Sequence, residues 1–182
     1  MKKKLCFLVL ASLISSCASQ NSNFLINHYE KCVDDFCLSN NDDFLTNMKD
    51  VDDYIHDGVF ILINRKENTY FKMTRYPGDP KYKMSLFEIG YIPTTDTLFA
   101  YEYEGSFITD NRTSLGDTAE KIIELQGVPH DVSVVDDYTV YHYKANESNS
   151  SYVQENNECA YIIEYWFVDR KLAKLIFGFD YP

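Results

Sequence analysis

The strongest pattern in the chain is a series of segments rich in β-branched and aromatic residues, separated by short runs of turn-forming residues. In the first half these segments cover residues 59–65, 68–76, 83–92 and 97–109. In the last of them, aromatic residues on one side alternate with polar residues on the other. Such alternation is typical of a sheet that has one buried and one solvated face. The pattern therefore predicts four strands in this half.

A second group of strands is predicted at the carboxyl end. It consists of four segments, residues 132–135, 138–144, 160–168 and 171–179. The pairs Asp136–Asp137 and Asp169–Arg170 are expected to form tight turns between neighbouring strands. The segment 145–158 is polar and has no periodicity, so it is predicted to be a mobile loop.

A single amphipathic helix is predicted between the two groups of strands, over residues 117–126. Asp117 is the expected N-cap, and Glu120 lies three residues later, as in a capping box. Gly127 suits the left-handed position after the last turn, and Pro129 prevents continuation of the helix. The expected buried stripe consists of Ala119, Ile122, Ile123 and either Gln126 or Val128.

The amino-terminal part of the chain also carries helical patterns. Apolar residues recur at three- and four-residue spacing from Phe44 to Ile55, and Gly58 follows them. This spacing predicts an amphipathic helix over about 42–55. The preceding segment, Phe24 to Cys37, is interpreted as a second, shorter helix.

Together these elements predict an α+β fold, in which an antiparallel sheet packs against a few short helices. A hydrophobic content of 45% and an aromatic content of 15% agree with a folded domain and argue against disorder. Residues 24–182 are enough for one domain with its own core. Because a helix precedes aromatic strands in both halves, the domain could also consist of two degenerate helix-plus-sheet units.

The first 23 residues differ in character from the rest. Three lysines precede an apolar run from Leu5 to Leu13, which has the layout of an export signal and is too short to cross a bilayer. The sequence Ile14-Ser15-Ser16-Cys17 then resembles the bacterial lipobox. That resemblance implies a signal peptide over residues 1–16, lipid attachment at the Cys17 sulfur, and a short lipidated tether over residues 17–23. Two or three acyl chains give stable anchoring, whereas one gives only reversible membrane binding.

The residue after this cysteine bears on the location that the resemblance implies. Ala18 stands where an aspartate would resemble the inner-membrane retention signal. In a cell with two membranes, the resemblance therefore implies an outer-membrane lipoprotein that faces the periplasm and contacts the membrane through its lipid alone.

The charge of the chain limits its partners. The formal net charge is −11, and loss of the three leader lysines would make it −14. Such a charge argues against nucleic acid as a partner and against contact of the domain with anionic lipid. A basic protein partner is more compatible with it, although most acidic surfaces only keep a protein dispersed.

Of the five cysteines, Cys6 lies in the segment that would be removed, and lipidation would use Cys17, so three remain. Cys32 and Cys37 enclose a short segment, so they are a plausible disulfide pair in an exported protein, and either could instead pair with Cys159. Together with His28, Cys32 and Cys37 could be read as metal ligands, but their spacing matches no zinc pattern. No metal or other cofactor is predicted.

The sequence contains no G-x-S-x-G, no H-E-x-x-H and no glycine-rich phosphate loop. On the predicted strands, His142 alternates with its neighbours, and Glu164 shares a face with Trp166. If these strands are adjacent, His142, Glu164 and Trp166 form one exposed surface. We therefore expect an interaction surface and no catalytic residues, and no small-molecule substrate is evident.

Residues 107–180 follow a recognisable order: a glycine-containing turn, a capped helix, an aromatic strand and a final hairpin. The positions that carry this order are Gly116, Asp117, Gly127, Pro129, Tyr141, Tyr143, Tyr165, Phe167, Leu172 and Ile176. The pattern is similar to that of the β-lactamase-inhibitor-protein-like (BLIP-like) fold, which the small outer-membrane lipoproteins of the SmpA/OmlA type share.

The resemblance implies a non-catalytic protein-binding module, as in the lipoproteins that help to hold an outer-membrane assembly. The inhibitor that gives the fold its name implies an alternative. In that case the chain would be a periplasmic inhibitor or immunity protein that neutralises a secreted enzyme or toxin.

The lipobox leads to a direct prediction. We expect the mature chain to begin at Cys17 and to carry a diacylglyceryl group on its sulfur, with an acylated amino terminus. Mass spectrometry of the amino-terminal peptide measures both features. An unmodified Cys17, or cleavage at another position, would contradict the prediction, and Cys17→Ala should leave the precursor uncleaved.

Overall fold

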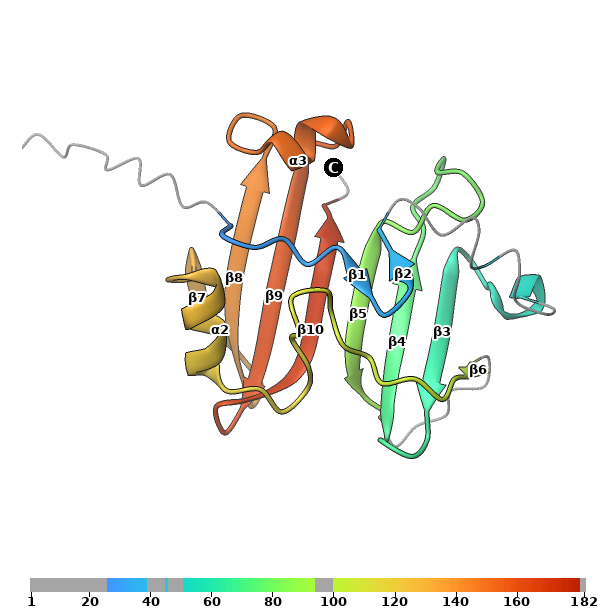
Figure 1. The fold of residues 1–182 in the computed structure, drawn as a ribbon, viewed down its shortest axis with the longest axis horizontal. Coiled ribbons are helices and arrows are strands. Elements are labelled where there is room, and N and C mark those ends of the chain that lie inside the picture. Colours follow the sequence, from blue (N-terminus) through green and yellow to red (C-terminus); the bar gives the residue numbers. More distant parts are fainter. Residues whose placement is uncertain (1–25, 39–44, 46–50, 94–99, 181–182) are drawn as a thin grey trace, which may run out of the picture.

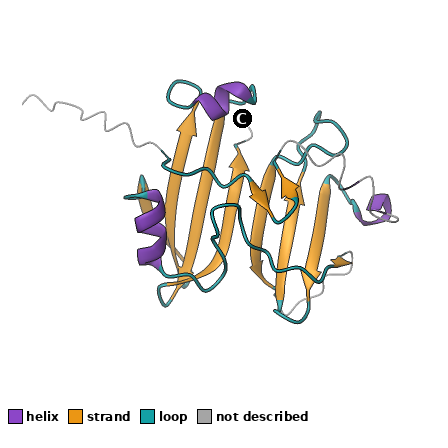
Figure 2. Cartoon of the chain, in the orientation of Figure 1, coloured by secondary structure: helices purple, strands orange, loops and turns teal. Residues whose placement is uncertain are grey.

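The computed structural model describes residues 26–38, 45, 51–93 and 100–180. Its main element is an eight-stranded sheet with the order β6-β3-β4-β5-β10-β9-β8-β7 (Figure 1). All neighbouring pairs are antiparallel except β3 and β6, which are parallel. Few and short helices accompany this sheet (Figure 2). The predicted α+β class is confirmed.

The strands of the large sheet are β3 (Val59–Asn64), β4 (Thr69–Thr74), β5 (Leu86–Tyr91), β6 (Tyr101–Glu102), β7 (Asp131–Val135), β8 (Tyr138–Asn146), β9 (Ala160–Val168) and β10 (Lys171–Phe179). A separate hairpin consists of β1 (Cys32–Val33) and β2 (Phe36–Cys37). The helical elements are η1 (Val51–Tyr54), α2 (Ala119–Gln126) and α3 (Ser151–Glu155).

The strand order divides the sheet into two similar halves. Strands β3-β4-β5 form one meander, β8-β9-β10 form another, and the two meet through antiparallel pairing of their last strands. The outer strands differ, because β6 is parallel and β7 antiparallel to its neighbour, and the helix predicted for a first unit lies mostly outside the described residues. The predicted division into two helix-plus-sheet units therefore stays a prediction. At the seam, Gly178 has a φ of 147°, and a Cβ there would lie 2.3 Å from the Ser85 carbonyl oxygen. Only glycine permits this close approach of the two halves.

The two faces of the sheet differ in what covers them. Burial alternates along the strands, as in β4 and β9. One face, called here the covered face, presents Phe60, Leu62, Phe71, Met73, Phe87, Ile89, Tyr143, Ile163, Tyr165, Phe167, Leu175 and Phe177 to the core. It is turned toward the viewer in Figure 1, where the hairpin, α2 and the connection from β6 to α2 lie across it. We call the opposite side the open face, because no described element lies over it.

The helix predicted over 117–126 is present as α2, but its capping differs from the prediction. Its N-cap is Thr118 and not Asp117, because the Thr118 side chain accepts the bond from the Lys121 N–H. The Asp117 carboxylate instead accepts from the Ser114 N–H and the Lys121 ammonium. No capping box with Glu120 results. The glycine after the helix, Gly127, has a positive φ of 83°, but its ψ of −165° lies outside the left-handed helical region that was predicted.

The buried stripe of α2 is narrower than predicted. Ala119, Ile122 and Gln126 are buried, as expected. Ile123 is 39% exposed, so its predicted burial is wrong. Of the two alternatives for the last position of the stripe, Gln126 is the buried one, and Val128 is 72% exposed. The helix is only 8 residues long and touches the sheet along one narrow line, so the next residue around the helix from Ile122 already faces away.

The predicted helix from Phe24 to Cys37 is wrong where the structure describes it. The segment forms the β1–β2 hairpin, with Val33 opposite Phe36 and Cys32 opposite Cys37. Hydrophobic side chains three residues apart face the same side across this tight turn, which imitates the spacing of a helix. Most of the other predicted helix, 42–55, lies outside the described residues; 51–54 form the 3-10 turn η1.

The predicted strand over 97–109 is also largely wrong. Residues 97–99 lie outside the described part of the chain, and only Tyr101–Glu102 pair as strand β6. Beyond β6 the chain leaves the sheet and crosses the covered face, where the Phe107 ring contacts Phe71 and Tyr103. The alternation of aromatic and polar residues in this segment therefore arises from an irregular connection with one buried side, and not from a strand.

The segment 145–158, predicted as a mobile loop, contains the short helix α3. Ser150 caps it by accepting from the Val153 N–H, and Val153 is fully buried. The Tyr152 ring contacts Tyr161 and stacks on Phe179. These contacts close one end of the core.

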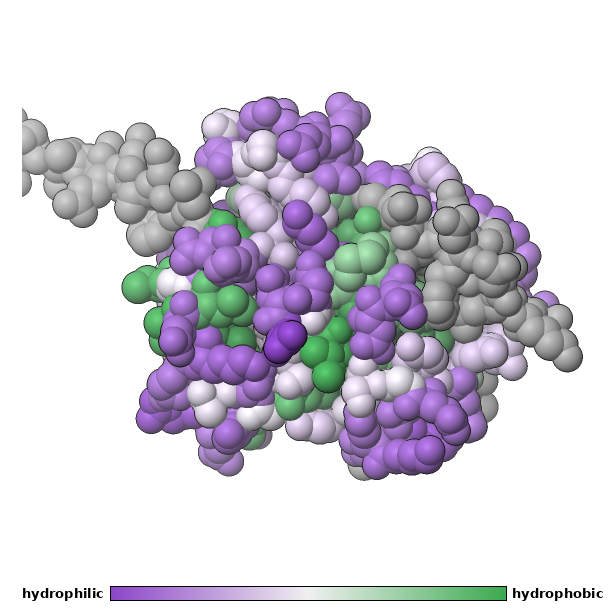
Figure 3. Space-filling view, in the orientation of Figure 1, coloured by the Kyte–Doolittle hydropathy of each residue, from purple (hydrophilic) through white to green (hydrophobic). Residues whose placement is uncertain are grey.

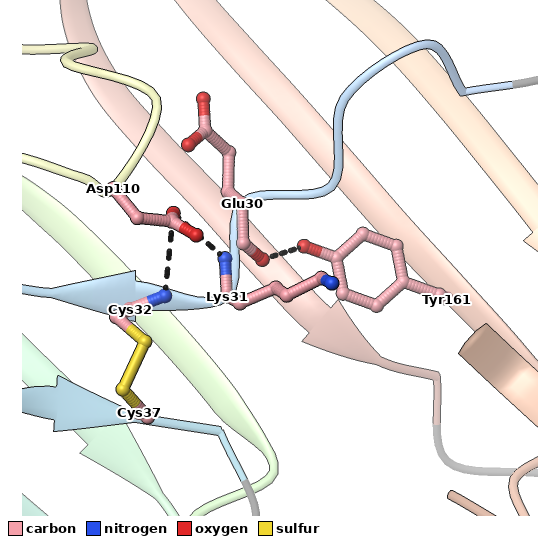
Figure 4. Close-up of a disulfide and its surroundings, with 6 residues drawn as sticks. All are labelled: Glu30, Lys31, Cys32, Cys37, Asp110 and Tyr161. Atoms are coloured by element: carbon pink, nitrogen blue, oxygen red, sulfur yellow. Dashed lines mark hydrogen bonds between the residues drawn. A yellow bond between two sulfur atoms is a disulfide. The ribbon is translucent and has the colours of Figure 1, made fainter. Parts of the chain in front are cut away.

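A buried carboxylate ties the amino-terminal segment to the rest of the fold. Glu30 is fully buried, and its carboxylate accepts hydrogen bonds from the Thr113 hydroxyl at 2.7 Å, the Tyr165 hydroxyl at 3.1 Å and the Asn111 amide at 3.1 Å. Its backbone carbonyl accepts from the Tyr161 hydroxyl (Figure 4). These donors come from β9 and from the connection before α2, so one residue links three parts of the chain.

The network continues from Tyr165 to α2. The buried Gln126 amide donates to the Tyr165 hydroxyl at 3.0 Å and to the His28 carbonyl at 2.6 Å. The His28 N–H donates back to the Gln126 side chain at 3.2 Å. Gln126 thus holds the entering chain against the end of α2.

Burial raises the pKa of Glu30 above its ordinary value, and the hydrogen bonds that it accepts only partly offset this. The neighbouring groups in the network are neutral donors, so no cation described here compensates its charge. Folding therefore favours the protonated carboxyl.

The α2 stripe provides a matched pair of substitutions. Ile122→Asp should lower the free energy of unfolding by about 3 kcal/mol or more, because it places a carboxylate in the core. Ile123→Asp, the control one position along the same helix, should change it by no more than about 0.5 kcal/mol. Urea denaturation measures both. Equal losses would show that the helix packs in another orientation.

Glu30 predicts a specific dependence of stability on pH. Because its folded-state pKa is raised, the free energy of unfolding should fall as pH rises from about 4.5 through that pKa. Glu30→Gln cannot ionise, so its stability relative to the natural chain should increase over the same range. Urea denaturation between pH 4 and pH 8 tests this, with Glu155→Gln, at an exposed position of α3, as the control. If the difference in unfolding free energy between Glu30→Gln and the natural chain stayed constant with pH, the raised pKa of Glu30 would be contradicted.

Candidate functional site

The open face carries a mixture of aromatic and charged side chains. Pairing in the sheet places the following residues on it: Tyr70, Lys72, Glu88, Tyr138, Val140, His142, Ile162, Glu164, Trp166, Lys174 and Ile176. Most of these side chains are half-buried by their neighbours on the same face and still reach solvent.

The three residues singled out from the sequence lie together on this face. His142 on β8 pairs with Glu164 on β9, and Trp166 follows Glu164 on the same side of β9. The His142 Nδ1 lies 3.4 Å from a Glu164 carboxylate oxygen, and the Trp166 indole donates to the other oxygen at 3.0 Å. Glu164 therefore fixes the orientation of both rings.

Two further residues, not identified from the sequence, complete an aromatic cluster around Trp166. The Lys174 ammonium lies 3.5 Å from the centre of the Trp166 ring, and the Tyr138 ring meets Trp166 edge-on at 5.5 Å. A cation over an indole face is attracted by the ring quadrupole. We call Tyr138, Trp166 and Lys174 the tryptophan cluster.

A shallow cavity adjoins the tryptophan cluster. It has a volume of about 210 Å³, and Tyr138 and Lys174 line it together with Tyr70 and Gly90 from the other half of the sheet. A Cβ on Gly90 would lie 2.7 Å from the Tyr70 ring, so this glycine allows the ring to lie flat across the strand. The Tyr70 hydroxyl donates to Glu88, which also pairs with Lys72 at 3.2 Å.

Ser133 on β7 extends the polar chain beyond His142. Its hydroxyl lies 2.7 Å from the His142 Nε2, so serine, imidazole and the Glu164 carboxylate follow one another in space. This is the order of a nucleophile, a general base and an orienting carboxylate. His142 and Glu164 are 31% and 25% exposed on an open strand surface, however, where water competes for these bonds. The same contacts are also compatible with a purely structural arrangement, in which Ser133 and Glu164 flank the His142 ring.

The edge of the sheet beside this site exposes apolar side chains. Of the seven large hydrophobic residues exposed in the described part of the chain, five lie on α2, just after it, or on β7: Ile123, Val128, Val132, Val134 and Val135. Strand β7 is the last strand of the sheet, so its outer backbone groups are not paired within the sheet. Hydrophobic surface is visible at this end of the molecule in Figure 3. An edge strand flanked by valines is a ready template for an added strand.

The cysteines are placed as follows. Cys32 and Cys37 form a disulfide across the β1–β2 hairpin, and Cys159 is free and exposed. The Asp110 carboxylate accepts from the Lys31 and Cys32 N–H groups beside this disulfide (Figure 4). Cys17, with the leader and the tether, lies outside the described residues. The disulfide removes Cys32 and Cys37 as metal ligands, and the described residues hold no cluster of three metal-ligating side chains.

No helix in the described part of the chain has both the length and the apolar character needed to span a membrane. No protein-family model, curated protein or solved structure was found to match the chain. The similarity to the BLIP-like fold therefore stays a prediction that rests on the residues quoted for it.

Proposed function

We propose that the chain is a lipid-anchored protein of the bacterial envelope that binds a protein partner through the open face of its sheet and has no catalytic role. The observation that carries this proposal is the tryptophan cluster. Tryptophan and tyrosine supply much of the energy of protein interfaces when they lie beside a pocket and are surrounded by contacts that exclude water. Here such a pair lies on a face that no described element covers.

Further features support the same proposal. Strand β7 continues the open face to an unpaired edge, so a partner could contact the cluster and add a strand at once. The formal charge of −11 favours a basic partner and speeds its encounter at low salt. The Ile14-Ser15-Ser16-Cys17 sequence supports the lipid anchor, and with it a place at the outer membrane, on the periplasmic side.

The proposal has two forms, which differ in the class of protein that the chain binds. An assembly subunit of the envelope would make the chain a structural lipoprotein, as in the SmpA/OmlA type. A secreted hydrolase or toxin would make it an inhibitor or immunity protein. The acidic charge fits both, and the first form fits the anchor better, because a fixed lipoprotein can hold a complex at the membrane.

The proposal predicts the effect of Trp166→Ala on partner capture. The full lipidated chain should capture a defined partner from detergent-solubilised envelopes, and Trp166→Ala should weaken that affinity by roughly 30-fold, as for an interface hot spot. Tyr82→Ala is the matched control, because Tyr82 also lies under a lysine, at 4.9 Å, but packs against the core and not on the open face. Surface plasmon resonance with the captured partner measures both variants.

Two outcomes would overturn the proposal. Equal binding by the Trp166→Ala variant and the natural chain would exclude the open face as the interface. Turnover of an envelope ester or amide that disappears in Ser133→Ala or His142→Ala would show that the serine–histidine–carboxylate chain is catalytic.

A further inference from the structure

A second cavity lies on the other side of the sheet, between its covered face and the connection from β6 to α2. It has a volume of about 300 Å³, at the lower end of the range for pockets that hold small ligands. Its apolar wall consists of Ile89, Phe107, Ile108 and Leu115. Its polar wall consists of Glu67, Thr69, Tyr91, Ser106 and Ser114. We call it the Thr69 cavity.

Thr69 is unusual among the residues of this cavity because its buried hydroxyl has no hydrogen-bond partner in the described part of the chain. The residue is only 7% exposed, and its hydroxyl is the one buried side-chain polar atom without a hydrogen-bond partner among the described residues. A buried hydroxyl that lacks a partner costs roughly 1–3 kcal/mol. Thr69 lines the cavity, but its hydroxyl has almost no accessible surface, so a donor group of a ligand reaches it only after rotation of the threonine side chain about χ1.

The surroundings of the cavity are acidic. The Glu67 carboxylate accepts from the Ser106 hydroxyl at 2.5 Å and keeps its other oxygen for a further donor. Asp34 lies nearby, since its N–H donates to the Ile108 carbonyl. Burial raises the pKa of Asp34, and the negative charges of Asp35 and Glu67 add to this effect.

The nearby cations do not neutralise these carboxylates. Arg65 pairs with Glu102 at 2.7 Å and Lys66 with Glu104 at 3.7 Å, so both are engaged elsewhere. No ion pair formed by Asp34, Asp35 or Glu67 occurs in the described part of the chain.

The mouth of the cavity also exposes apolar surface. Tyr91 is 46% exposed and Ile108 is 41% exposed. They are the two exposed large hydrophobic residues that do not belong to the α2–β7 edge, and both line this cavity. The apolar part of a ligand would therefore contact Tyr91 and Ile108 at the mouth of the cavity, while its polar end reached the polar wall.

We propose that the Thr69 cavity binds a primary alkylammonium group, in the form of a lysine side chain of a basic partner. An ammonium has three N–H donors and no acceptor, which suits the Glu67 carboxylate and the unpaired Thr69 hydroxyl. The four methylenes of lysine match the walls formed by Ile89, Phe107 and Leu115. The cavity lies on the covered face, opposite the proposed interface. Its occupant is therefore a lysine of a basic protein other than the partner of the open face, and the inference does not rest on the proposed function.

The test uses small probes and needs no partner. Nα-acetyl-lysine amide is titrated into the folded chain, and methyl NMR signals of Ile89, Ile108 and Leu115 are followed. We expect saturable shifts with a millimolar Kd, and no comparable shift with the neutral analogue Nα-acetyl-norleucine amide. Glu67→Gln should weaken binding tenfold or more. The exposed α3 variant Glu155→Gln, which removes the same charge elsewhere, should leave it unchanged.

Thr69→Val separates a binding role from a structural one. Valine has a similar shape and lacks the hydroxyl, so the melting temperature should stay equal or rise, while the affinity for the lysine probe should fall about threefold or more. Stronger binding of cadaverine than of the lysine amide would identify a free amine as the natural source of the same group.

Three results would overturn the inference: no saturable shift, equal binding of the norleucine amide, or natural affinity in both Glu67→Gln and Thr69→Val. None of them depends on Trp166. Loss of lysine binding with intact partner capture would therefore remove this inference alone, and loss of capture with intact lysine binding would remove the proposed function alone.

Discussion

The fold depends on the burial of one carboxyl group. Glu30 belongs to a segment that has no strand in the large sheet, and its hydrogen bonds to Thr113, Asn111 and Tyr165 fix that segment over the covered face. The hydrophobic side chains of the hairpin, Val33 and Phe36, reach full burial only from this position. A buried polar group that is satisfied in one arrangement and not in others selects that arrangement, at the cost of desolvating it.

Local patterns in the sequence are sufficient to predict most strands of the large sheet. They are insufficient to predict the segments that lie across its covered face. The strands 160–168 and 171–179 were predicted with the bounds that the structure has, because alternation and the Asp169–Arg170 turn are local properties. The hairpin at 32–37 was mistaken for a helix, because its shape is set by Glu30 and by the sheet beneath it. The exposure of Ile123 likewise depends on how far α2 reaches over the sheet, which its own sequence does not contain.

The candidate site shows the same limit. His142, Glu164 and Trp166 could be placed on one surface from alternation and an assumed pairing of two strands. Ser133 could not, because its contact with His142 requires the register of β7 on β8. Thr69 gave no signal at all. A threonine in a strand is ordinary, and only the structure shows that its hydroxyl lacks a partner.

If the chain is held by its amino end, as proposed, the disulfide of the hairpin has a mechanical consequence. Tension applied before residue 32 would pass from Cys32 to Cys37 through the sulfur atoms and would bypass residues 33–36. The backbone of residues 33–36 would then not be stretched, and the packing of Val33 and Phe36 against the core would hold the hairpin as one unit. The first bonds to bear it would be those between His28 and Gln126, followed by those of Glu30 and those that Asp110 accepts from Lys31 and Cys32, all upstream of the covalent link. A pull on the tether would thus peel the entering chain while the hairpin stayed seated on the core.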